Sequence, residues 1–150
     1  MSFQLVHDSR NNHYRRPYGA VPCGTAVNIY LDANAMQMPE SVHLRVWSGV
    51  TGEKILEPLT VEEDPCCFRY KFTVMAPEKP GLVWYRFQVK YENYTCWYGA
   101  PPDGLGGEGQ QYRVDTQTDW QITVYDASAK VPAWYTNGIM YQIFPDRFYR

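Results

Sequence analysis

Apolar and polar residues alternate with a period of two along most of the first 125 residues. In the segment 82–91, for example, Val83, Tyr85 and Phe87 fall on one face, whereas Trp84 and Arg86 fall on the other. The same alternation occurs in 25–32, 41–48 and 67–74, and shorter candidate strands lie at 94–98, 112–114 and 120–125. Each segment is typical of a β-strand with one buried and one solvated face.

Turn-forming residues separate these predicted strands. Ser, Gly, Pro and Asn gather at 48–52, 78–81 and 92–93, where neighbouring strands should reverse direction. About seven short strands without an amphipathic helix predict an all-β fold, an Ig-like antiparallel β-sandwich, over residues 1–127. The Cys-Trp-Cys spacing of true immunoglobulin domains is not evident, so only the architecture is predicted.

The pattern changes after residue 127. Pro132 marks a predicted linker over 128–138, and the apolar run Ile139–Phe144 that follows lacks alternation. A continuous apolar run is typical of a strand buried on both faces in a parallel sheet. We therefore expect a second structural unit to begin at 139–150.

Composition and charge narrow the function classes. The net charge of −2 and the absence of a basic cluster argue against a nucleic-acid partner. No apolar run is long enough to span a membrane, and no signal peptide is apparent, so we expect a cytoplasmic protein. The four cysteines form no C-x-x-C pair and are expected to be reduced, although a disulfide from Cys96 to another cysteine is an alternative.

Two further features lack the pattern of a ligand site. The three histidines are scattered and predict no metal site; we expect each to be solvated or hydrogen-bonded. The segment 99–109 is rich in glycine, but a strand-like sequence follows it where a phosphate-binding loop would lead into a helix. A mobile surface loop is the expectation there.

The last 17 residues, "WYTNGIMYQIFPDRFYR", resemble the start of the catalytic barrel in the α-amylase family of glycoside hydrolases, particularly its neopullulanase- and cyclomaltodextrinase-like members. The family's string Tyr-Gln-Ile-Phe-x-Asp-Arg-Phe forms the first barrel strand and its turn. The stretches 7–9, 105–109 and 120–125 also resemble parts of the sandwich that precedes that barrel. The resemblance implies that a truncated first strand of a (β/α)8 barrel follows the sandwich, and that the chain is the N-terminal part of a longer enzyme.

The resemblance also implies where the chemistry lies. The family hydrolyses or transfers α-glucosidic bonds with retention, using an aspartate nucleophile and a glutamate acid/base on later barrel strands. No acid of this chain maps to them, so we expect no catalytic residue here. Tyr141, Asp146 and Arg147 are expected to be framework residues of the barrel start. This chain is expected to hold no cofactor, whereas calcium is an alternative for the parent enzyme, since some relatives bind it in the loop that follows.

For the sandwich, the resemblance implies two roles. It binds α-glucan on aromatic platforms, or it packs against the enzyme's own catalytic barrel or a second subunit of a homodimer. The carbohydrate-binding candidates are Trp47, Trp84, Tyr94, Trp97 and Tyr98. For each ring, packing in the core or an interface is the alternative, and Trp120 and Trp134 are expected to pack. A stand-alone Ig-like interaction module without a carbohydrate role is the alternative function.

Overall fold

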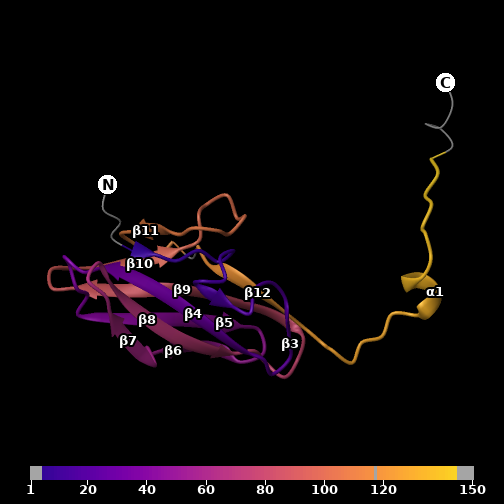
Figure 1. The fold of residues 1–150 in the computed structure, drawn as a ribbon, viewed down its shortest axis with the longest axis horizontal. Helices are drawn as coiled ribbons and strands as arrows, with labels where there is room; N and C mark the ends of the chain where they lie inside the picture. Colours follow the sequence, from indigo (N-terminus) through magenta and orange to yellow (C-terminus); the bar gives the residue numbers. More distant parts are fainter. Residues whose placement is uncertain (1–4, 117, 145–150) are drawn as a thin grey trace.

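The computed structural model describes residues 5–116 and 118–144, in which two β-sheets face each other (Figure 1). The first sheet contains β1 (Leu5–Val6), β2 (Arg15–Arg16), β4 (Ala26–Asn34), β7 (Thr60–Glu63) and β8 (Cys67–Met75). The second sheet contains β3 (Val21–Pro22), β5 (Ser41–Ser48), β6 (Gly52–Leu56), β9 (Gly81–Tyr91), β10 (Tyr94–Gly99), β11 (Gln110–Tyr112) and β12 (Trp120–Tyr125). The all-β sandwich predicted from the alternation is confirmed.

Strand β9 organises the second sheet. Along one edge it pairs with β5, which in turn pairs with β6. Along the other edge its first half pairs with β12 and its second half with β10. All described strand pairs are antiparallel except β12 with β3, which is parallel. In the first sheet, β4 and β8 pair over nine residues and form the centre.

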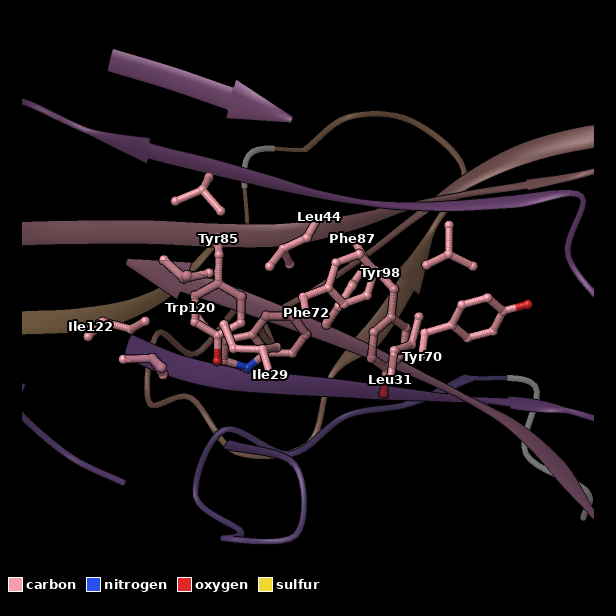
Figure 2. Packing of buried hydrophobic residues seen from close by; sticks show 14 of the residues in the cluster. Ile29, Leu31, Leu44, Tyr70, Phe72, Tyr85, Phe87, Tyr98, Trp120 and Ile122 are labelled. Atoms are coloured by element: carbon pink, nitrogen blue, oxygen red, sulfur yellow. The ribbon is translucent and has the colours of Figure 1, made fainter. Parts of the chain in front are cut away.

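The core lies between the two sheets and is rich in aromatic rings (Figure 2). Ile29 and Phe72 from the first sheet, and Tyr85 and Phe87 from the second, are fully buried. The rings of Tyr85 and Trp120 stack with centroids 5.4 Å apart. Burying side chains of this size is the main favourable contribution to folding, at about 1.5–3 kcal/mol for each large apolar residue.

The expected strand boundaries agree with the structure where one face is buried. Strands β5 and β12 have the predicted bounds, and β9 begins one residue earlier than predicted. Strands β6 and β7 were not predicted, because their residues are almost all exposed and show no alternation in burial. The predicted strand 112–114 is displaced, since β11 covers Gln110–Tyr112.

The segment after β12 leaves the sandwich (Figure 1). It contains the short helix α1 (Ala133–Thr136), and the described residues 126–144 form no strand. Ile139 and Tyr141 are 91% and 86% exposed. The barrel strand expected at 139–150 therefore stays a prediction, and Asp146 and Arg147 lie outside the described residues. Among the described helices, none is long and apolar enough to cross a membrane.

Candidate functional site

Three of the five predicted carbohydrate-binding residues lie on the outer face of the second sheet. Trp47 on β5 and Trp84 on β9 occupy directly opposite positions in the strand pair. Trp97 on β10 faces the same side, because its neighbours Cys96 and Tyr98 both point into the core. Trp47 is 45% exposed, whereas the other two indoles are half-buried.

A network of ion pairs lies at the centre of this face. Arg86 on β9 is only 2% exposed, yet it projects from the outer side of the sheet. Its Nη1 donates to Oδ1 of Asp119 at 2.6 Å, and its Nη2 lies 2.6 Å from Oδ1 of Asp115. Its guanidinium carbon lies 5.2 Å from the ring centroid of Trp97. Arg86 is therefore fixed by two carboxylates and by a cation–π contact.

A second arginine lies beside the first. Arg45 on β5 donates through Nε and Nη2 to the two carboxylate oxygens of Glu53, at 2.7 Å and 2.9 Å. These hydrogen bonds hold the pKa of Glu53 below its usual value. Burial has the opposite effect on Asp119 and raises its pKa to about 6.

These side chains surround a hollow of about 400 Å³ on the outer face of the second sheet. It is lined by Arg45, Trp47, Trp84, Arg86 and Asp119. The hollow combines flat apolar rings with charged donors and acceptors whose positions are fixed by their ion pairs. Such a surface suits a ligand that has both an apolar face and a rim of hydroxyl groups.

The other two candidates do not join this cluster. Tyr98 is 3% exposed and packs in the core, where its hydroxyl accepts a hydrogen bond from the His7 backbone N–H at 3.3 Å. A ring buried in this way offers no platform at the surface, so the expectation for Tyr98 is corrected. Tyr94 is 40% exposed and stacks on Tyr91 with ring centroids 4.8 Å apart. It lines a different hollow, together with Arg113.

The charged residues of the site were not predicted as candidates. Arg45 and Arg86 lie on the solvated faces of their strands, beside the predicted tryptophans. The alternation in the sequence therefore indicates that these two arginines share a face with the tryptophans. Asp115 and Asp119 lie between β11 and β12. No pattern marks these two aspartates, because only the fold brings their segment to Arg86.

The glycine-rich segment is tied to the N-terminal segment. Gly107 O accepts hydrogen bonds from Ser9 N at 3.0 Å and from Trp120 Nε1 at 3.1 Å, and Gly107 N donates to Ser9 Oγ at 2.9 Å. Gly109 N donates to His7 O at 2.9 Å. The end of the segment, at Gly107 and Gly109, is therefore paired with a buried part of the sandwich, whereas residues 102–105 lie exposed at the surface as expected. The mobility of the exposed part stays a prediction.

One histidine and the remaining two tryptophans lie outside this hollow. His7 is fully buried and hydrogen-bonded to Tyr85 Oη at 3.0 Å, and Trp120 packs in the core as expected. Trp134, also expected to pack, is 76% exposed.

The four cysteines are free thiols, and Sγ of Cys66 and Cys67 lie 4.0 Å apart. Within 5–116 and 118–144, no three His, Cys, Asp or Glu side chains gather closely enough to hold a metal ion.

Comparisons with known proteins give relatives over nearly the whole chain. No family model matches it. Over 148 residues, or 97% of the chain, it is 35% identical to the amylopullulanase of Thermoanaerobacterium thermosulfurigenes and 33% identical to that of Thermoanaerobacterium saccharolyticum. The chain spans only 8% and 11% of the lengths of these relatives.

A solved structure is similar to the chain at the level of the fold. A cyclomaltodextrinase superposes on 97% of the chain with a TM-score of 0.61 and 15% sequence identity, and the match covers 24% of that protein. The likeness in fold agrees with the sequence similarity to the amylopullulanases. The chain is thus similar in sequence to a part of the amylopullulanases and in fold to a part of the cyclomaltodextrinase.

Proposed function

We propose that this chain is the non-catalytic domain of a glycosidase that acts on α-glucans, and that it binds α-glucan in the hollow around Trp84. The names of its relatives, amylopullulanase and cyclomaltodextrinase, denote enzymes of α-glucans. The observation that supports binding is the pairing of Trp47 with Trp84 on one outer face, beside the fixed polar groups of Arg45 and Asp119.

The physical reason is a match between the two surfaces. One face of a glucose ring presents C–H groups that pack against an indole, while the hydroxyl groups on its rim need hydrogen-bond partners. The guanidinium of Arg45 supplies donors and the carboxylate of Asp119 supplies acceptors at the edge of the rings. Because both groups are already held by ion pairs, little side-chain freedom is lost when sugar binds.

Packing against the catalytic barrel or a second subunit is the other candidate role. The observation that favours it is a group of exposed apolar side chains on and near the edge strands β6 and β7. Ile55, Leu59 and Val61 are 60%, 64% and 46% exposed. Exposed apolar side chains on sheet edges are typical of surfaces that another protein covers.

Titration with maltoheptaose, followed by tryptophan fluorescence and calorimetry, tests glucan binding. We expect Trp84→Ala to weaken binding at least tenfold, which corresponds to about 1.4 kcal/mol. Trp47→Ala should weaken it less, because that indole lies at one end of the hollow. Trp134→Ala is the matched control, since this tryptophan is 76% exposed and lies outside the sandwich.

Three results would contradict parts of the proposal. Absence of any heat or fluorescence change with maltoheptaose would overturn glucan binding, and a concentration-dependent dimer in sedimentation would then favour packing. Equal binding of cellohexaose would show that the surface does not select α-linked glucan. Release of new reducing ends from maltoheptaose by this chain would contradict its non-catalytic assignment.

A further inference from the structure

A second hollow adjoins the first on the outer face of the second sheet. It measures about 610 Å³, and Trp84 and Asp119 line both hollows. Its lining also includes Tyr18, in the segment before β3, and Leu105, in the glycine-rich segment. Tyr18 is 54% exposed and Leu105 is 69% exposed, so both side chains are accessible to a ligand.

The strand register shows that the two hollows lie along one line. Trp47 is opposite Glu53 on β6 and opposite Trp84 on β9, and Trp84 is opposite Gln121 on β12. Opposite positions follow one another across the sheet at about 4.8 Å per strand. The row from Glu53 to Gln121 therefore crosses four strands roughly at right angles, over about 14 Å. The second hollow continues this row toward Tyr18.

The walls of the second hollow are fixed before any ligand binds. Arg15 is 5% exposed and donates to Gln121 O at 3.0 Å and to Gly19 O at 2.7 Å, which ties the Tyr18 segment to β12. Arg10 Nη2 donates to Leu105 O. Preformed walls reduce the entropy lost on binding, so the hollow is suited to hold a ligand in one orientation.

We infer that the two hollows form one continuous site for an α-glucan oligosaccharide that runs across the strands. Trp84 lies under its middle, Trp47 contacts one end, and Tyr18 with Leu105 contacts the other. This inference rests on the proposed function. It extends the proposed glucan site from a single aromatic platform to a longer site that selects ligands by chain length. It also gives the glycine-rich segment a role as a wall of the site.

Calorimetry with the series from maltose to maltoheptaose tests the inference on the 150-residue chain. We expect affinity to rise at least fivefold between maltotriose and maltoheptaose. Tyr18→Ala should remove most of this rise and leave maltotriose binding within twofold of the unchanged chain. Tyr141→Ala is the matched control, because this tyrosine is 86% exposed and lies outside the sandwich. Thermal unfolding establishes that each variant keeps its fold.

The outcomes separate this inference from the proposed function. If no maltooligosaccharide binds, both are overturned. If maltotriose and maltoheptaose bind equally well, or if Tyr18→Ala leaves the rise with chain length intact, glucan binding stands and the continuous site is overturned. If Leu105→Ala also reduces the rise, the glycine-rich segment contributes to the site as inferred.

Discussion

Protonation of His7 should destabilise the sandwich as pH falls. The ring is fully buried, with Nδ1 at 2.7 Å from Tyr30 O and Nε2 at 3.0 Å from Tyr85 Oη. Burial lowers its pKa from 6.5 to about 3, and the charge of nearby Arg15 acts in the same direction. The folded chain therefore keeps this histidine neutral at pH values where the unfolded chain binds a proton.

The size of the effect follows from the two pKa values. Between pH 6.5 and 3 the unfolded state holds one more proton at His7, so the free energy of unfolding falls by about 1.4 kcal/mol for each unit of decreasing pH. Summed from pH 7.5 to pH 5, the loss is about 2 kcal/mol. With ordinary urea m-values, the unfolding midpoint moves down by about 1 M.

The assay compares the unchanged chain with His7→Gln by urea unfolding at pH 7.5, 6 and 5. The comparison is needed because Asp119 has an effect of the opposite sign. Its pKa is raised to about 6 in the folded chain, so its protonation increases the free energy of unfolding as pH falls through the same range. That contribution is common to both proteins and cancels in the difference. The stability difference between them should shrink by about 2 kcal/mol from pH 7.5 to pH 5.

Two observations would refute this reasoning. One is a stability difference that stays constant across the pH range. The other is a His7 ring-proton resonance that titrates near pH 6.5 in the folded protein. The second measurement needs no variant, so it decides the matter even if His7→Gln does not fold.

The remaining predictions concern the glycine-rich segment. A Cβ at Gly109 would lie 2.5 Å from an atom of the buried Tyr98 ring, so Gly109→Ala should cost about 1–3 kcal/mol in urea unfolding. Gly49→Ala, which meets no atom within 4 Å, should be nearly neutral; equal effects would contradict the packing argument. Ser9→Ala removes the hydroxyl that accepts from Gly107 N, and it should weaken maltoheptaose binding more than maltotriose binding in calorimetry.

Alternation predicted the sandwich because most of its strands have one buried and one solvated face. It also determines which aromatic residues can lie together at the surface. Trp97 and Tyr98 are neighbours on β10, so only one of them can face outward; including both among the candidates ignored this constraint. The pairing of Trp47 with Trp84 depends on which strands associate and in what register. The sequence of either strand alone does not contain that information.

The stretches that resemble the α-amylase family outside the barrel start have a shared physical role in this sandwich. The segment 7–9 and the glycine-rich segment exchange backbone hydrogen bonds, and Trp120 joins them through its indole N–H. On its inner side this assembly buries His7 among aromatic rings. On its outer side the same assembly positions Leu105 at the wall of the second hollow. Substitutions in these stretches therefore act on core stability and on the shape of the proposed glucan site together, because one set of backbone hydrogen bonds supports both.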